Sequence, residues 1–132
     1  MLRMTRLADY AVLLMTHIGT SEALLSANQL ADETSLPLPT VKKILKLLAR
    51  HDLVDSERGV SGGYRLARLP AEITLEDMVH AVEGPIALAD CVADGPGSCD
   101  LESNCPVAPR WFAVTNTIQR ALSGVTLREM MP

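Results

Sequence analysis

Apolar residues recur at steps of three and four positions in several stretches of the chain, which is typical of helices that bury one face. The first stretch runs from residue 5 to residue 19, where Gly19 ends it. Ser26 followed by Gln29 has capping-box spacing and begins a short second helix. Pro39 suits the first turn of a third helix, which runs to about His51 with basic residues on its outer side. Two short helices with a tight turn between them predict a helix-turn-helix.

A β-hairpin is predicted directly after these helices. Residues 53–57 and 64–67 are typical of strands, and a glycine-rich turn at residues 58–63 joins them. Glycines are common at hairpin tips because such turns need positive φ angles. A bare backbone with Arg58 at the tip also suits a narrow minor groove, whose negative potential attracts a guanidinium group. Behind a helix-turn-helix, we interpret this hairpin as a DNA-binding wing.

The second half of the chain predicts two more helices around a segment with few apolar residues. Thr74 caps a helix that ends at Gly84, and the segment at residues 90–104 is rich in glycine, proline and acidic residues. A long helix over about residues 106–123 carries one apolar stripe, close to a coiled-coil seam: Val107, Trp111, Val114, Ile118 and Leu122. Such a stripe can pack inside one subunit, but a long helix after a complete winged domain more often dimerises, so we expect this stripe to pair two copies of the chain.

The patterns together predict a mainly α-helical fold with a two-stranded β-wing. Residues 1–84 form a winged helix-turn-helix domain, residues 85–105 a cysteine-containing loop, and residues 106–132 a dimerisation helix with a C-terminal turn. Thr126 and Glu129 have the spacing that caps this final turn.

Charge is unevenly distributed along the 132 residues, whose net charge is −4. Residues 36–68 hold seven basic and three acidic side chains, whereas residues 69–132 hold three basic and nine acidic ones. The basic middle can attract phosphates, although a solvated helix face explains the same charges. Aromatic residues make up only 3% of the chain, which counts against a platform that stacks single-stranded bases.

Several function classes lack support in the sequence. No apolar run reaches the roughly 18 residues of a membrane span, and the first residues do not resemble a signal peptide, so we predict a cytoplasmic protein without a membrane partner. No catalytic triad, paired carboxylates or phosphate-cradling glycine motif is evident. We therefore predict no enzymatic activity and no small-molecule substrate.

The three cysteines of the chain, Cys91, Cys99 and Cys105, lie within fifteen residues of one another. An odd number in a cytoplasmic protein argues against a disulfide framework. Structural zinc sites favour closely spaced cysteine pairs, and this sequence has none. Three thiolates at wide spacing favour an iron–sulfur cluster with a different fourth ligand, while zinc and a thiol redox switch stay open as alternatives.

The order of these features resembles the IscR/NsrR/RirA family of winged-helix transcriptional regulators over essentially the whole chain. The resemblance is carried by "RMTRLADYA" at residue 3, "RGVSGGY" at residue 58, "EGP" at residue 83 and the three cysteines. Asp52 stands where the family more often has glycine. The arrangement is most similar to the branch that regulates SUF iron–sulfur assembly genes. The resemblance implies a homodimer on a double-stranded DNA operator, with an iron–sulfur cluster (4Fe-4S or 2Fe-2S) that changes operator affinity.

The resemblance also implies roles for individual residues. The IscR branch has a histidine ligand where this chain has Ala108, so this chain lacks that ligand. The NsrR branch uses an aspartate of the first helix, often from the partner subunit, and Asp9 occupies that place. The implied DNA contacts lie on the recognition helix, the wing and the first helix: Thr40, Lys42 and Lys43; Arg58 and Ser61; Thr5 and Arg6.

The sequence thus predicts a cluster-sensing DNA-binding regulator, a repressor of iron–sulfur biogenesis genes. One alternative is a repressor that responds to nitric oxide or iron with the same cluster. Another, from a different class, is a small cluster-carrier or electron-transfer protein whose helix-turn-helix only serves packing.

Overall fold

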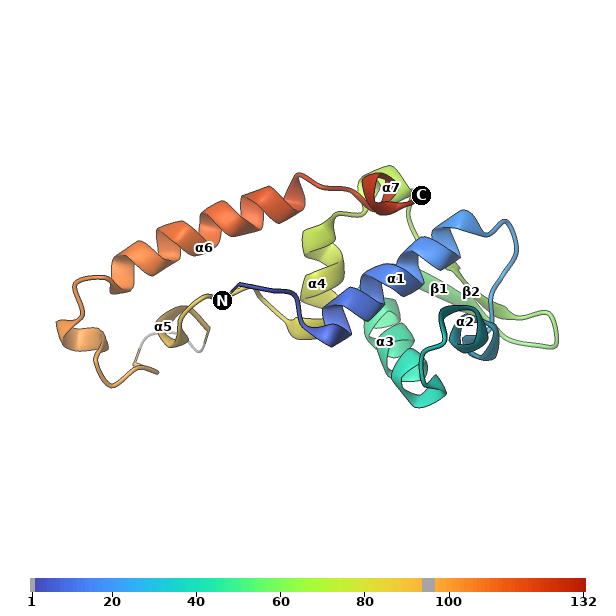
Figure 1. The fold of residues 1–132 in the computed structure, drawn as a ribbon, viewed down its shortest axis with the longest axis horizontal. Helices are drawn as coiled ribbons and strands as arrows, with labels where there is room; N and C mark the ends of the chain where they lie inside the picture. The colour runs from blue at the N-terminus through green and yellow to red at the C-terminus, as the bar shows by residue number, and fades with distance from the viewer. Residues whose placement is uncertain (1, 94–96) are drawn as a thin grey trace.

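Helices dominate the chain, and the computed structural model describes residues 2–93 and 97–132. Its elements in chain order are α1 (Arg6–Thr20), α2 (Ala27–Thr34), α3 (Leu38–Arg50), β1 (Val54–Glu57), β2 (Gly63–Leu66), η1 (Pro70–Glu72), α4 (Leu75–Glu83), α5 (Asp90–Ala93), η2 (Glu102–Asn104), α6 (Ala108–Ser123) and α7 (Leu127–Met130). The predicted mainly α-helical class with a two-stranded wing is confirmed (Figure 1). None of the helices in these two ranges is both long and apolar enough to cross a membrane.

Side-chain caps explain where four of the helices begin. The hydroxyl of Thr5 accepts a hydrogen bond from the N–H of Ala8, 3.1 Å away, at the start of α1. Reciprocal capping boxes begin α2, α4 and α7: Ser26 with Gln29, Thr74 with Asp77, and Thr126 with Glu129. Each cap satisfies backbone N–H groups that have no partner within the helix.

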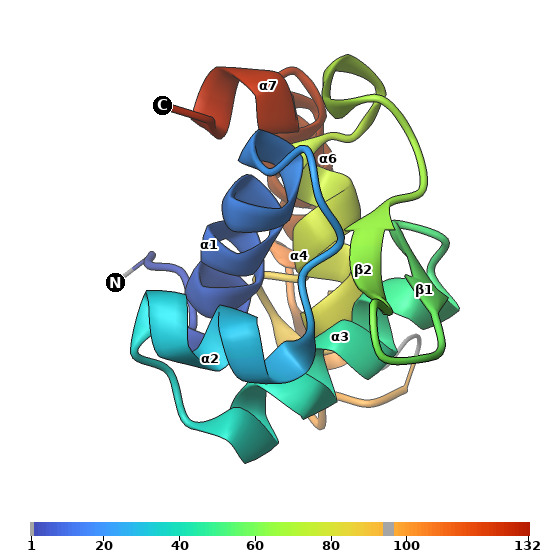
Figure 2. The ribbon, with the colours of Figure 1, turned by 90° about the vertical axis from the view of Figure 1, so that its right-hand side faces the viewer.

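The core lies where α1, α3 and α4 meet, with α2 and α7 at its margins (Figure 2). Its fully buried side chains come from each of these helices: Leu14, Met15, Leu30, Ile44, Leu45, Leu48, Met78 and Leu127. The end of the chain returns to this core through two backbone hydrogen bonds of 2.8 Å, from Leu127 to Ile73 and from Leu75 to Val125. Helix α7 therefore packs on the winged domain, although α6 separates the two in sequence.

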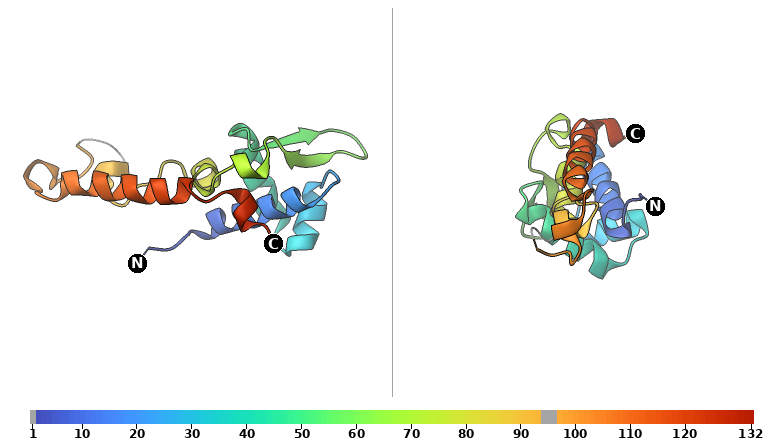
Figure 3. Two further views of the ribbon diagram at one scale, coloured as in Figure 1. Left: turned by 90° about the horizontal axis from the view of Figure 1, so that it is seen from above. Right: turned by 90° about the vertical axis from the view of Figure 1, so that its left-hand side faces the viewer.

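Helix α6 leaves this body and extends to one end of the molecule, while the wing extends to the other (Figure 3). Only Ala108 and Thr115 of α6 are buried. The short helix α5 and the turn η2 lie beside the N-terminal end of α6, in a segment that was predicted to be a loop (Figure 1). α6 itself begins at Ala108, two residues later than the pattern indicated.

Candidate DNA interface and cysteine segment

Helix α3 has a buried apolar side and a basic outer side. Val41, Ile44, Leu45 and Leu48 are buried in the core. Lys42 and Lys43 are exposed, Thr40 is half-buried, and Lys46 adds a further exposed amino group. In the described ranges, no carboxylate forms an ion pair with any of these lysines. Helix α3 thus presents uncompensated positive charge, which is what a DNA backbone attracts.

The chain turns sharply at both ends of α3. Ser35 takes a left-handed conformation, φ 58°, directly after α2, and Pro37 precedes α3. Asp52, which stands in the place of a glycine, has φ 57°. Aspartate tolerates this conformation better than most residues do, so the turn keeps the geometry that glycine allows. Backbone bonds from Asp52 to Ala49 and from Leu53 to Leu48, both 3.1 Å, close this turn.

The wing is a tight antiparallel hairpin with one free guanidinium at its tip. β1 and β2 pair from Val54 opposite Leu66 to Glu57 opposite Gly63. A side chain at Gly62 would place its Cβ 2.2 Å from the backbone oxygen of Glu57, so only glycine fits there. Arg65 forms an ion pair with Glu57 at 2.7 Å, whereas the exposed Arg58 has no acidic partner in the described chain. Ser61 is exposed beside it.

The predicted phosphate contacts at the start of α1 lie at the surface, but Thr5 already has two other interactions. Its hydroxyl caps α1 and also donates to the carboxylate of Glu83, 2.5 Å away, at the end of α4. This bond ties the start of α1 to the point where the chain leaves the winged domain. Arg6 is exposed. The roles of Thr5 and Arg6 in DNA binding stay predictions.

All three cysteines are free thiols in the segment beside α6. Cys91, in α5, is only 5% exposed, while Cys99 and Cys105 are half-buried. Three hydrogen bonds connect the backbone around them. Ser98 donates its hydroxyl to the carbonyl of Asp90 at 2.8 Å, Glu102 donates its N–H to Cys99 at 3.1 Å, and Cys105 donates its N–H to Glu102 at 3.3 Å.

These thiols are the soft ligands that iron–sulfur clusters require, and the three bonds hold their backbones in one local unit. Among residues 2–93 and 97–132, no three histidine, cysteine, aspartate or glutamate side chains are grouped as a closed metal site. The donor chemistry therefore fits an iron–sulfur cluster, although the three thiols are not grouped around one metal position in the described ranges.

The candidate fourth ligands lie apart from this segment. Asp9 is exposed in the first turn of α1, within the winged domain, whereas the cysteines lie beside the far end of α6 (Figure 1). Ala108, which replaces the histidine of the IscR branch, is buried and supplies no ligand. A role for Asp9 toward the cysteines of its own chain therefore has no support in this arrangement.

Glu102 is a residue of the cysteine segment that sequence reasoning missed. Its carboxylate accepts the N–H of Gly97 at 2.6 Å and so closes the turn that contains Cys99. Its position three residues after Cys99 was the only sequence signal for this contact. Glu83 and Ser98 were missed as well, because their partners lie far along the chain or at backbone atoms.

Replacing Glu102 with alanine should loosen the turn around Cys99 in the metal-free protein. A hydrogen bond of this kind contributes about 1 kcal/mol, so the alkylation rate of Cys99 should rise about fivefold. Mass spectrometry after timed iodoacetamide treatment measures the rate for each cysteine. Glu102→Gln keeps an acceptor oxygen and serves as the control, which should react as the wild type does. Equal rates for Cys99 in the alanine variant and the wild type would show that the turn does not depend on Glu102.

Comparison with known proteins places these features in one family. Residues 4–132 match the Rrf2 family model, described as an iron-dependent transcriptional regulator. The chain is 32% identical over 131 residues to the protein aau3 of Rhizobium meliloti, covering 98% of this chain and 85% of that one. It is 26% identical over 132 residues to the HTH-type transcriptional regulator IscR of Aliivibrio salmonicida, and the match covers 98% of this chain and 77% of that one.

Solved structures show the same fold. The global cysteine regulator CymR of B. subtilis aligns with a TM-score of 0.77 at 24% identity, over 98% of this chain and 96% of that one. IscR of T. potens aligns with a TM-score of 0.71 at 26% identity, over 98% and 85%. The winged body and the long helix that leaves it are therefore shared by regulators with different names.

Proposed function

This chain belongs to the Rrf2 family of transcriptional regulators, and from that premise we propose that it represses iron–sulfur biogenesis genes as a cluster-sensing homodimer. It is a regulator and not an enzyme. The observation that carries the proposal is the cysteine segment, in which three free thiols share one local hydrogen-bonded unit outside the winged domain. DNA reading and metal sensing would thus occupy separate parts of one chain.

The winged domain supplies the DNA contacts of the proposal. The uncompensated lysines of α3 suit the major groove, where Lys42 or Lys43 can donate to guanine or neutralise a phosphate. Arg58 extends from the other side of the domain at the wing tip, and Ser61 can donate to a phosphate beside it. Thr40 lies at the start of α3, where the N-terminal residues of a recognition helix meet base edges.

The dimer of the proposal is formed by α6. Several large apolar side chains remain exposed on this helix and at the residue before it: Trp111, Phe112, Val114 and Val107. An isolated helix with one buried edge and such an apolar surface is rarely stable in water, and a second copy would cover it. Two copies related by a twofold axis would present their α3 helices to successive major grooves, about 34 Å apart.

Cys91, Cys99 and Cys105 are the residues that would hold the cluster, with Asp9 as the fourth ligand. Because Asp9 lies in the winged domain and away from the cysteines of its own chain, it would complete the site of the second subunit. A bound cluster supplies an iron centre that iron scarcity, oxidants or nitric oxide can remove. The bond between Thr5 and Glu83 joins α1 to the linker toward the cysteine segment. Ordering of that segment can therefore be transmitted to the winged domain through this bond.

Anaerobic purification tests the metal part of the proposal directly. The wild-type protein should be coloured, with iron and acid-labile sulfide in similar amounts. Cys105→Ser removes one of the three thiolates and should lose most of the iron, while its far-ultraviolet circular dichroism stays unchanged because Cys105 lies outside the helical core. Ser103→Ala, at an exposed position two residues before Cys105, keeps all three thiols and the three hydrogen bonds of the segment; it is the matched control and should retain colour. A colourless wild-type protein that contains zinc would refute cluster sensing.

A further inference from the structure

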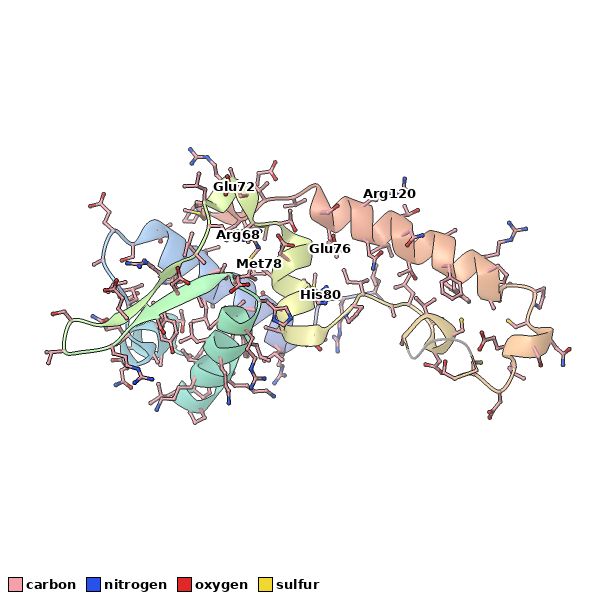
Figure 4. All side chains as sticks on the ribbon, turned by 180° about the vertical axis from the view of Figure 1, so that it is seen from behind. Arg68, Glu72, Glu76, Met78, His80 and Arg120 are labelled. Atoms are coloured by element: carbon pink, nitrogen blue, oxygen red, sulfur yellow. The ribbon has the colours of Figure 1, made fainter. Side chains whose placement is uncertain are left out.

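Two of the three histidines of the chain lie side by side at the surface where α3 ends against α4. The ring centres of His51 and His80 are 5.8 Å apart, and the ring planes are tilted by 51°. His51 follows the last residue of α3, and His80 lies in the last turn of α4. Both side chains are exposed, and Figure 4 shows His80 on the side of α4 that faces α3. Nothing in the proposed function uses this pair.

A hydrogen bond fixes which nitrogen of His51 is available. Nδ1 of His51 lies 3.0 Å from the carbonyl oxygen of Leu47. A carbonyl only accepts, so Nδ1 carries the hydrogen, and the neutral ring leaves the lone pair of Nε2 free. This arrangement, in which one ring nitrogen donates to a backbone carbonyl and the other is free, is the usual state of a histidine that binds a metal.

The local field at the pair favours a cation. The C-terminal end of a helix carries partial negative charge, and two such ends converge here, those of α3 and α4. Asp52, exposed directly after His51, adds a carboxylate to the neighbourhood, and Arg50, exposed directly before it, adds a guanidinium.

We propose that His51 and His80 form a surface site for a divalent transition-metal ion of the class that prefers imidazole, such as Ni²⁺ or Zn²⁺. Imidazole nitrogens bind these ions at about 2.0–2.1 Å, so two coordinating rings have their centres about 4.5 to 6.5 Å apart, depending on the angle between the two metal–nitrogen bonds. The observed separation of 5.8 Å lies in this range. Water completes the coordination, because no third ligand residue joins the pair within the described ranges.

An ion at this site would link the end of the recognition helix to α4. Helix α4 ends at Glu83, the partner of Thr5, immediately before the linker to the cysteine segment. The ion would therefore stabilise the contact between α3 and α4 by binding only the folded arrangement. This site is independent of the cysteines, and its presence does not depend on the proposed cluster.

Paramagnetic Ni²⁺ provides a probe that reports on each histidine separately. In the full-length protein with labelled imidazole rings, NiCl₂ titration should broaden the ring resonances of His51 and His80 first. His17 pairs with Glu33 at 3.6 Å on another surface and should remain sharp at the same Ni²⁺ concentration. Broadening of all three rings together would mean non-specific association and would overturn the proposal.

Single substitutions distinguish Ni²⁺ binding at the histidine pair from Ni²⁺ binding at other ligands, including the thiols. In His80→Ala, the broadening of His51 should need at least about tenfold more Ni²⁺, because one of two protein ligands is lost. The thermal midpoint should rise with Ni²⁺ in the wild type and in His17→Ala, the matched control, but not in His80→Ala. If His51 broadens at the same Ni²⁺ concentration in His80→Ala and in the wild type, the two rings do not share an ion.

Discussion

Val114→Glu in α6 should convert the protein to a monomer and lower its operator affinity by about a hundredfold or more. Val114 is 43% exposed on the single chain, among the exposed apolar side chains of α6 that we assign to the dimer. In the dimer the substitution would bury one unpaired carboxylate from each subunit, which an apolar interface does not tolerate. Operator affinity falls because two linked winged domains bind a two-part site far more tightly than one domain does.

Sedimentation velocity measures the oligomeric state, and fluorescence anisotropy with a labelled operator measures affinity. Asn116→Glu is the matched control. It adds the same charge two positions along α6, where the exposed side chain points nearly to the opposite side of the helix. The control should remain a dimer with wild-type affinity. If the Val114→Glu variant sediments as the control does, α6 does not form the dimer interface.

Arg58→Ala should weaken operator binding by about tenfold to a hundredfold without changing cluster content. Arg65, the other arginine on the strands and tip of the wing, is neutralised by Glu57 at 2.7 Å, whereas Arg58 has no acidic partner in the described part of the chain. Its guanidinium is therefore free for the minor groove. A dimer has two wings, so the substitution removes this contact at both half-sites. The loss of binding free energy is therefore twice that of one contact.

Salt titrations distinguish this contact from a general loss of folding. If Arg58 neutralises one phosphate in each subunit, the slope of log affinity against log salt should fall by about two for Arg58→Ala. Arg128 lies on α7, at the opposite end of the body from α3 (Figure 2). Arg128→Ala should leave both affinity and slope unchanged. Arg58→Ala with wild-type affinity would refute the role of the wing tip.

Local chemistry made much of this fold predictable. The capping pairs Ser26 with Gln29 and Thr74 with Asp77 are close in sequence, and both form as expected. The wing was predictable because its glycines mark a turn that other residues cannot make. The contact of α7 with the core was not predictable, because it depends on backbone bonds from Leu127 to Ile73 and from Leu75 to Val125, which are far apart in sequence.

The candidate site was predictable in its residues and not in its arrangement. Three cysteines within a short segment indicated a soft metal centre. No sequence pattern predicted the bond from Ser98 to the carbonyl of Asp90, which joins the neighbours of Cys99 and Cys91. The bond between Thr5 and Glu83 spans 78 positions and exists only because α1 packs against α4. The place of Asp9 apart from the cysteines follows from tertiary structure and requires a second subunit for any shared site.

In the proposed function, metal occupancy of the cysteine segment controls how the winged domains bind DNA. The most direct test compares cluster-loaded protein with protein from the same preparation stripped of its cluster, on the DNA upstream of its own operon. The two affinities should differ by about fivefold to a hundredfold, the range of typical allosteric coupling, and the difference should vanish in Cys105→Ser. Equal affinities of loaded and stripped wild-type protein would show that metal occupancy does not control DNA binding.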